Sequence, residues 1–369
     1  MLKKTLYRKR EILSKGLLIL PSANGGIKME IKLLAENKLE KLKHTENRHR
    51  LLKDETLSSV VSIEAEMLKA ARHYFDNFGF TEVVVPHITK ATGACENIDT
   101  MFALDYFGER SYLVQTGQLY LEALIQRLGN VYCIGPSFRA EPDVDNRHVT
   151  EFTLIELELA CNFEELLAHI ETIVHAMIHR VAQNKKQELE NIGIDRKRLL
   201  STKLPFVRIN YTDAIEILQS LDVNVSWGDD LKSIHEKKIV EYFKNMPTFI
   251  THYPEAIKFF NMKRNAHDEK IVNSADLILP YSGECAGSAE REHDYNALVE
   301  KLGKSNMLRM LEKRGGSIED FRWYLDHVKD GIEPHSGCGI GLNRVVQFVL
   351  GTDDIRACTA YPLNRESLM

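Results

Sequence analysis

Short apolar segments that follow one another at close intervals set the strongest limit on the fold of this chain. β-Branched and aromatic residues gather around 112–114, 130–134 and 152–155, after a first segment over 81–86 that ends in proline. Except for the first, the connections are too short for the crossover helix that joins parallel strands. The sequence therefore predicts a sheet whose strands are mostly antiparallel.

Apolar residues at helical spacing predict two long helices beside this sheet. One covers 60–78 and precedes the first strand. The other begins at a capping box formed by Asn162 and Glu165, and it carries apolar residues over 170–181. We therefore expect the α+β class, with an antiparallel sheet flanked by helices.

Charge divides the chain into a basic arm and an acidic body. Residues 1–53 carry a net charge of +9, whereas the whole chain carries −5. We expect residues 1–54 to form an arm, helical or partly disordered, with a charged helix over 29–54. Its cations can form a solvated helical face or bind nucleic acid. Residues 55–369 should form one large domain with an insertion at about 205–270, and its acidic charge makes it a poor general binder of nucleic acid.

Composition and cysteine spacing exclude several classes of protein. No apolar stretch reaches the roughly 18 residues of a membrane helix, and the apolar run after the basic N-terminus is too short for a signal peptide. The six cysteines form no Cys-x-x-Cys pair, which leaves neither a zinc site nor a disulfide framework. We therefore predict a cytoplasmic protein without a membrane partner.

Two arginines separated by a short loop form the first candidate site. Arg139 and Glu141 end one predicted strand, and Arg147 and His148 stand before the next strand, which includes Phe152. The loop brings both arginines within reach of one polyanion, and guanidinium groups suit phosphate because they bind it in a bidentate way and keep their charge. Phe152 offers an aromatic face for a base, and Glu141 an acceptor for an exocyclic amine.

Glycines followed by an arginine form the second candidate site. The segment 337–344 reads GCGIGLNR and leads into a predicted helix over 340–350. Glycines allow a strand to run close to a ligand, and Arg344 adds a third cation directed at phosphate. Taken alone, a tight strand-to-helix packing turn would explain the same glycines.

Together these strings resemble the three signature motifs of the class II aminoacyl-tRNA synthetases, in their aspartate and asparagine branch. The first motif, a long helix and a strand that ends in proline at a dimer interface, is similar to residues 57–86. The second is similar to residues 138–158 and the third to residues 337–347. The resemblance implies the class II synthetase catalytic fold over residues 55–369, ligase activity and a homodimer.

The resemblance also implies how ATP is held. Arg139 would bind the α-phosphate and the substrate carboxylate, Glu141 would bind the adenine amino group, and Phe152 would stack on the adenine. The β- and γ-phosphates would be neutralised by Arg147, His148 and Arg344. The candidate catalytic residues are therefore Arg139 and Arg344.

A magnesium site and a mechanism follow from the same resemblance. Glu284 is similar to the family's magnesium-binding glutamate, and Asp276 to a second, water-mediated contributor, although a solvated strand end explains Asp276 equally well. Mg²⁺ suits hard oxygen ligands together with ATP phosphates. The reaction needs no general base, because the amino-acid carboxylate attacks the α-phosphorus in line and the protein supplies positioning and charge neutralisation.

Three further residues match positions that select the amino acid in this family. Glu96 and Gln118 would hold the α-amino group, and Arg291 would read the side-chain carboxylate or amide. Aspartate enzymes of the family typically have a lysine where this chain has Leu121. One missing cation favours the neutral amide of asparagine over aspartate, unless another positive group takes its place.

Two differences from the family concern the transfer step. Residues 1–54 are too short for the family's N-terminal anticodon-binding β-barrel of roughly 100 residues. Asp143 and Asp145 lie in a loop that is often basic in the family and contacts tRNA, so they should repel its phosphates. tRNA is therefore a possible partner, but we expect no anticodon-binding domain that would recognise it.

Three functions remain open. The first is an asparaginyl-tRNA-synthetase-like enzyme that forms an aminoacyl-adenylate from ATP and a small amino acid. The second is an asparagine synthetase that uses aspartate, ammonia and ATP, because segments 276–281 and 290–292 are similar to an archaeal synthetase-related enzyme. The third is a non-catalytic paralogue that acts as a sensor or scaffold, and the retained arginines and Glu284 argue against it.

Overall fold

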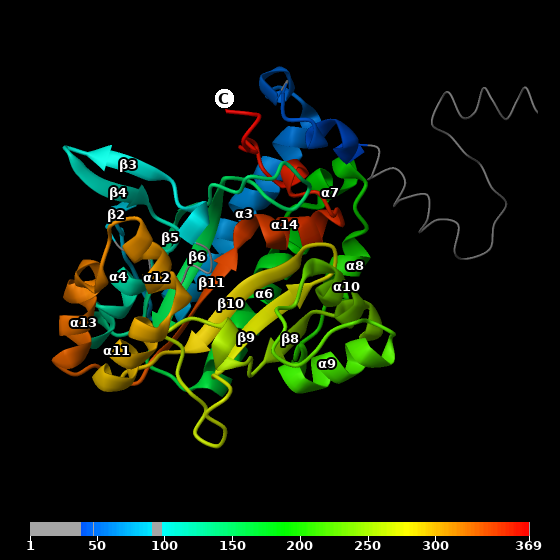
Figure 1. Cartoon of the computed structure of the whole chain (residues 1–369). Coiled ribbons are helices and arrows are strands. Elements are labelled where there is room, and N and C mark those ends of the chain that lie inside the picture. The colour runs from blue at the N-terminus through cyan, green and yellow to red at the C-terminus, as the bar shows by residue number, and fades with distance from the viewer. Residues whose placement is uncertain (1–37, 47, 91–97, 369) are drawn as a thin grey trace, which may run out of the picture.

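A large β-sheet forms the centre of the protein in the computed structural model, which describes residues 38–46, 48–90 and 98–368 (Figure 1). In spatial order, the sheet within these residues consists of β1 (Thr81–Glu82), β5 (Val131–Phe138), β6 (Glu151–Leu159), β11 (Ser336–Gly341), β10 (Gly283–Glu290), β9 (Ser274–Leu279), β8 (Thr248–Thr251) and β7 (Val207–Asn210). The two edge pairs, β1–β5 and β7–β8, are parallel, and the other pairs are antiparallel. The predicted α+β class with a mostly antiparallel sheet is confirmed.

Helices cover one face of this sheet. α6 (Phe163–Asn184) and α14 (Leu342–Leu350) pack against its strands, and α3 (Glu55–Asn77) packs on these helices (Figure 1). Successive strand residues point to opposite faces, so Ile155 and Leu157 of β6 lie in the core with the helices, whereas Glu156 and Glu158 face a cavity on the other side. The predicted capping box at the start of α6 is confirmed by reciprocal side-chain to backbone hydrogen bonds.

Helix α14 begins two residues later than the sequence predicted. Its first residue is Leu342, whereas the expected start was Ile340. Ile340 and Gly341 remain in β11 because they pair with Ile155 and Leu154 of β6. The helix therefore starts where the strand pairing ends.

A second layer lies beside one edge of the large sheet. A three-stranded sheet, within the described residues, consists of β2 (Ile88–Thr89), β4 (Glu109–Leu113) and β3 (Ala103–Tyr106) in that order (Figure 1). The helices next to it in Figure 1 are α4 (Gln118–Glu122), α11 (Tyr295–Lys304), α12 (Asn306–Lys313) and α13 (Arg322–Lys329). The short helix α5 (Ile125–Leu128) follows α4 along the chain. A separate apolar core holds α11, α12 and α13 together around Leu298 and Tyr324.

The segment 205–270, which the sequence analysis expected as an insertion, is built into the large sheet. It supplies β7 and β8, and β8 pairs with β9 in antiparallel fashion. Its helices α9 (Tyr211–Ser220) and α10 (Ser233–Tyr242) form an apolar core with these strands. The remaining helical elements are α7 (Lys186–Ile192), α8 (Arg196–Leu200) and the 3-10 turns η1 (Lys41–Lys43), η2 (Arg48–Leu51), η3 (Ile98–Thr100), η4 (Glu255–Ile257), η5 (Ile318–Phe321) and η6 (Ile355–Cys358).

The described end of the basic arm is docked on the body. The predicted charged helix over 29–54 lies partly outside the described residues, and from residue 38 onward it is broken into a helical turn and two 3-10 turns instead of one helix. Arg48 is 1% exposed, and its Nη2 donates to the carbonyls of Leu42 and, at 2.8 Å, Arg356. Burial lowers the pKa of Arg48 to about 10. These contacts tie the arm to η6.

Among the described residues, no helix combines the length and the apolar character that a membrane span requires. The cytoplasmic location stays a prediction.

The docking of the arm leads to a stability prediction. We expect Arg48→Ala to lower the free energy of unfolding by about 2–3 kcal/mol, because the buried Leu42 carbonyl and the partly buried Arg356 carbonyl lose a charged donor. Chemical denaturation of the purified variant measures this change. Arg50→Ala, an exposed neighbour of the same type, is the control. Equal effects of the two substitutions would contradict the buried role of Arg48.

Candidate functional site

A cavity of about 390 Å³ lies on the face of the large sheet opposite α6 and α14. Gly339 and Gly341 of β11 line it, and the absence of side chains there leaves room above the strand. The structure brings together in its lining the predicted site residues Gln118, Arg139, Glu141, Arg147, His148, Phe152, Asp276, Glu284, Arg291 and Arg344. Glu96 lies outside the described residues, and the roles of all these residues stay predictions.

Three arginines gather at one end of the cavity. Arg344, in the first turn of α14, donates to the Ser282 carbonyl at 2.6 Å and to the Arg147 carbonyl at 2.9 Å. Burial lowers the pKa of Arg344 and the Arg147 guanidinium lowers it further, while Glu236 and Glu284 oppose these shifts. Arg139 is exposed and the Arg147 side chain is 29% exposed. Neighbouring cations that repel one another are stabilised by an anion, so this end of the cavity suits a polyphosphate.

A carboxylate that the sequence analysis missed lies among these arginines. Glu236 of α10 is 3.5 Å from Arg147 Nη2 and accepts the Glu284 N–H at 3.3 Å. Burial raises the pKa of Glu236, although Arg147 opposes this shift. Gly283, in the left-handed region at φ +73°, leaves space for this contact, since a Cβ there would meet the Glu236 carboxylate. The sequence carried no signal for Glu236 because it lies outside all three motifs, in the segment 205–270.

The loop between β5 and β6 is organised by its own aspartate. Asp145 accepts the backbone N–H groups of Arg147 and His148 at 2.8 and 2.9 Å, and its carboxylate is 2.9 Å from His148 Nδ1. Asn146 then joins the loop to η6, where the Ile355 N–H donates to its carbonyl at 2.9 Å. Asp145 thus positions Arg147 and His148, while Asp143 remains exposed to solvent.

An aromatic side chain, Phe152, lines the cavity beside these arginines. The guanidinium carbon of Arg139 lies 5.5 Å from the centre of the Phe152 ring. Arg139 directly follows β5, and its N–H donates to the Thr150 carbonyl at 2.9 Å, which fixes its backbone against the start of β6. A planar group that enters between Arg139 and Phe152 would meet a cation on one side and a ring on the other.

The carboxylates proposed for magnesium differ in their surroundings. Both oxygens of Asp276 accept from Lys258 Nζ, at 2.7 and 3.0 Å, so this carboxylate already has a cation. Glu284 lies in the cavity lining at an exposed position. A Cβ at Gly287 would stand 3.2 Å from Glu284 Oε1 and 3.8 Å from Asp276 Oδ1, so glycine makes room for both groups. Glu284 therefore fits a magnesium ion, and Asp276 would join it only if Lys258 moved.

The opposite end of the cavity holds a buried ion pair. Arg291, 3% exposed, donates through Nη2 to Glu158 at 2.6 Å and through Nε to both Glu158 oxygens at 3.2 Å. Gly337 of β11 is paired with Glu158, and any Cβ at position 337 would overlap the Glu158 carboxylate. Sequence reasoning missed Glu158, although alternating acidic residues on an otherwise apolar strand, Glu156 and Glu158, are a signal that could have found it.

Gln118 and Leu121 lie on the same short helix, but Gln118 faces the cavity and Leu121 faces the core. Gln118 lines the cavity and donates to Glu122 at 2.6 Å, a second buried carboxylate that the sequence analysis missed. Leu121 is fully buried in an apolar cluster with Val85 and Val131. The position where aspartate enzymes typically have lysine is therefore part of the core in this chain.

A family model, a curated relative and a solved structure that are similar to this chain are all described as tRNA synthetases or ligases. The family model described as tRNA synthetases class II (D, K and N) matches residues 40–365. The asparagine–tRNA ligase of Desulforamulus reducens is 40% identical over 86% of this chain and 72% of its own length. The solved structure of asparaginyl-tRNA synthetase from Pyrococcus horikoshii with asparaginyl-adenylate is similar with a TM-score of 0.80, at 35% identity over 91% of this chain and 73% of that one.

A second solved structure extends this likeness to another organism. Asparaginyl-tRNA synthetase from Entamoeba histolytica, in complex with asparaginyl-adenylate, is similar with a TM-score of 0.75. It is 30% identical to this chain, and the match covers 88% of this chain and 71% of that one.

Glu236 leads to a prediction about anion binding. Because it competes with phosphate for Arg147, we expect Glu236→Gln to bind ATP about five- to tenfold more tightly, or about 1 kcal/mol. Isothermal titration calorimetry with ATP measures the change, and Glu241→Gln on the exposed side of α10 is the control. Weaker binding by Glu236→Gln alone would indicate that Glu236 assists ATP binding instead of opposing it.

Proposed function

Because the chain belongs to the class II tRNA synthetases of the D, K and N type, we propose that it activates asparagine with ATP and Mg²⁺ as an aminoacyl-adenylate. It is an enzyme of the aminoacyl-tRNA ligase kind. The observation that carries the proposal is one cavity with three arginines at one end and the Arg291–Glu158 pair at the other. The names of the similar proteins favour tRNA as the acceptor, and we propose a homodimer on the resemblance of residues 57–86.

We call the end of the cavity with Arg139, Arg147 and Arg344 the nucleotide end. There the protein positions ATP and neutralises the charge of its phosphates. In the proposed reaction an oxygen of the asparagine carboxylate bonds to the α-phosphorus, and the bond from this phosphorus to the leaving pyrophosphate breaks. Arg139 holds the α-phosphate and the attacking carboxylate, while Arg147, His148 and Arg344 neutralise the leaving group. Glu141 and Phe152 hold the adenine. Magnesium, held by Glu284, would add positive charge along the phosphates when bound.

We call the end of the cavity with the Arg291–Glu158 pair the amino-acid end. In the proposed function this end distinguishes an amide side chain from a carboxylate side chain. Arg291 offers N–H donors and an ionised Glu158 offers acceptors, so together they complement the oxygen and the NH₂ group of an asparagine side chain. An aspartate side chain presents acceptors alone, and one of them would face the Glu158 carboxylate. We propose that Gln118, which lines the same cavity, binds the α-amino group.

Another positive group could replace the lysine that aspartate enzymes typically have at the position of Leu121, and Lys258 is the candidate. Lys258 lines the same cavity, but its charge is balanced by Asp276 at 2.7 Å. A balanced cation does not replace the lysine that aspartate enzymes typically carry at the position of Leu121. Asparagine therefore remains the favoured substrate.

The other two functions make different predictions. An asparagine synthetase would release free asparagine from aspartate, ammonia and ATP, which chromatography of the reaction detects. A non-catalytic paralogue is disfavoured because the chain belongs to a family of ligases and retains Arg139, Arg147 and Arg344. The predicted absence of an anticodon-binding domain concerns residues 1–54, most of which lie outside the described residues, and it stays a prediction.

Pyrophosphate exchange tests the activation step. We expect the purified protein to exchange labelled pyrophosphate into ATP with asparagine and Mg²⁺, and Arg344→Ala to reduce this rate roughly 10²–10³-fold, because a charge-stabilising donor is lost. Arg322→Ala, an exposed arginine of α13, is the control. Absence of exchange by the unaltered protein with both asparagine and aspartate would contradict the proposal.

The buried Glu158 leads to a pH prediction. Burial raises the pKa of Glu158 to about 7, although Arg291 opposes the shift. Glu158 therefore gains a proton as the pH falls through about 7, and the acceptor for the amide NH₂ is lost. We expect the ratio of kcat/KM for asparagine to that for aspartate to fall by up to about tenfold per pH unit below this point. Exchange assays from pH 5.5 to 8.5 measure the ratio, and a constant ratio would contradict the role of Glu158.

A further inference from the structure

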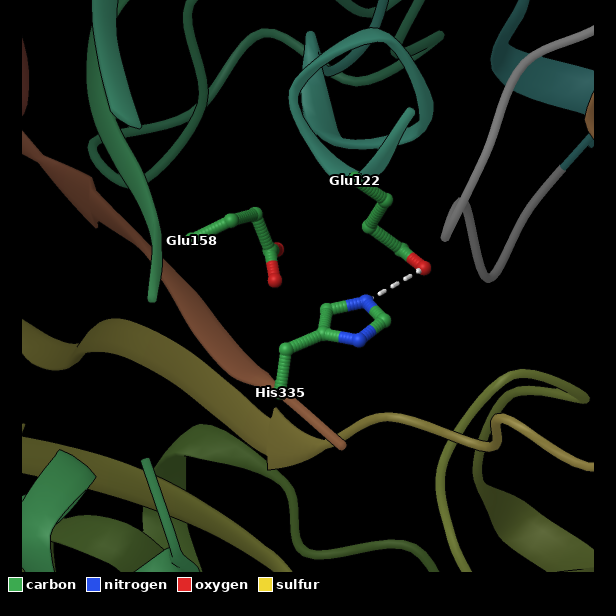
Figure 2. Close-up of side chains that lie close together, drawn as sticks. All are labelled: Glu122, Glu158 and His335. Carbon is green, nitrogen blue, oxygen red and sulfur yellow. Dashed lines mark hydrogen bonds and ion pairs between the residues drawn. The ribbon is translucent and has the colours of Figure 1, made fainter. Parts of the chain in front are cut away.

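Three buried side chains converge behind the amino-acid end of the cavity. Figure 2 shows the carboxylates of Glu122 and Glu158 and the imidazole of His335 directed toward one another. They come from α4, from β6 and from the residue before β11, and each is at most 1% exposed. Within residues 38–46, 48–90 and 98–368, this is the one group of acidic, histidine or cysteine side chains close enough to share a metal ion.

The hydrogen bonds of Glu122 argue against a metal at this place. Its Oε1 accepts from Gln118 at 2.6 Å and from Asn261 at 3.3 Å. Its Oε2 accepts from Tyr324 at 2.7 Å and lies 3.2 Å from His335 Nε2. The Arg291 guanidinium is 3.9 Å from the same carboxylate and would repel a second cation. The group is therefore a filled hydrogen-bond network.

The protons of His335 follow from its partners. Nδ1 lies 2.8 Å from the Glu333 carbonyl, which can only accept, so Nδ1 carries a proton. Nε2 faces a Glu122 carboxylate that already receives three other donors, an environment that keeps Glu122 ionised. A second proton therefore lies on Nε2, and His335 is an imidazolium paired with Glu122.

Glu122 touches both side chains that we assign to the amino acid. It accepts from Gln118, proposed for the α-amino group, and it is 3.9 Å from Arg291, proposed for the side chain. Four charged groups thus share one buried volume: the carboxylates Glu122 and Glu158 and the cations Arg291 and His335. With Glu158 ionised their charges cancel, and without His335 one carboxylate would be unbalanced.

We propose that Glu122 and His335 are positioning residues for amino-acid selection, which hold Gln118, Arg291 and Glu158 in the arrangement that fits an amide side chain. This inference rests on the proposed activation of asparagine. The charged groups that face Glu158 are Arg291, Glu122 and His335, and the neighbouring Tyr324 stays neutral because burial raises its pKa well above its usual value. The positive charge of His335 favours the ionised form of Glu158. Replacing His335 by a neutral residue should therefore favour protonated Glu158.

The test compares His335→Gln with the unaltered protein in pyrophosphate exchange with asparagine and with aspartate. We expect the KM for asparagine to rise at least tenfold, while the KM for ATP changes less than twofold. The pH at which the asparagine-to-aspartate ratio is halved should move upward, because Glu158 loses a cationic neighbour. His267→Gln, an exposed histidine in the loop before β9, is the matched control.

A milder variant covers the case in which His335→Gln does not fold. Tyr324→Phe removes one hydroxyl donor to Glu122 and keeps all four charges, and we expect a smaller rise in the KM for asparagine with an unchanged KM for ATP. Equal rises in both KM values in either variant, or an unchanged amino-acid ratio and pH midpoint in folded His335→Gln, would overturn the inference. If only Tyr324→Phe folds, an unchanged KM for asparagine would overturn it. If the unaltered protein itself exchanges with no amino acid, the proposed function fails instead.

Discussion

The contact between Glu158 and Arg291 across β11 is the constraint on which the amino-acid end depends. β11 lies between β6 and β10 in the sheet, so a side chain of β6 and the residue after β10 can meet only above β11. Gly337 is the residue beneath this contact, and a Cβ there would overlap the Glu158 carboxylate. The strand order, the glycine and the ion pair are therefore parts of a single arrangement. A buried pair of this kind stabilises little by itself, because desolvation offsets much of the attraction, so its value lies in the specific geometry that it fixes.

Charge is separated along the cavity in a way that suits the proposed reaction. The cations of Arg139, Arg147 and Arg344 lie near one another. Burial and then Arg147 lower the pKa of Arg344, while Glu236 and Glu284 oppose this shift. At the other end, acidic and basic groups balance. A polyphosphate would relieve repulsion among the arginines, whereas a neutral side chain would leave the balanced end undisturbed. We propose that the Glu236 carboxylate, 3.5 Å from Arg147, partly neutralises the charge of this arginine when phosphate is absent.

Local signals in the sequence predicted much of the fold and several residues that line one end of the cavity. The capping box of Asn162 and Glu165, the antiparallel strands and the arginines of the loop between β5 and β6 are all short-range patterns. The residues that were missed depend on contacts between distant segments. Glu122 meets His335 over a separation of 213 residues, and Glu158 meets Arg291 over a separation of 133 residues. The start of α14 was predicted two residues early because strand pairing with β6, which the sequence does not display, keeps Ile340 and Gly341 extended.

We propose that this cavity joins asparagine to AMP. The most direct measurement is mass spectrometry of the product that remains bound after incubation with ATP, Mg²⁺, pyrophosphatase and each of the twenty amino acids in turn. We expect asparaginyl-adenylate to accumulate on the protein and aspartyl-adenylate to be much less abundant near neutral pH. Absence of any adenylate, or accumulation of aspartyl-adenylate alone, would contradict this proposal.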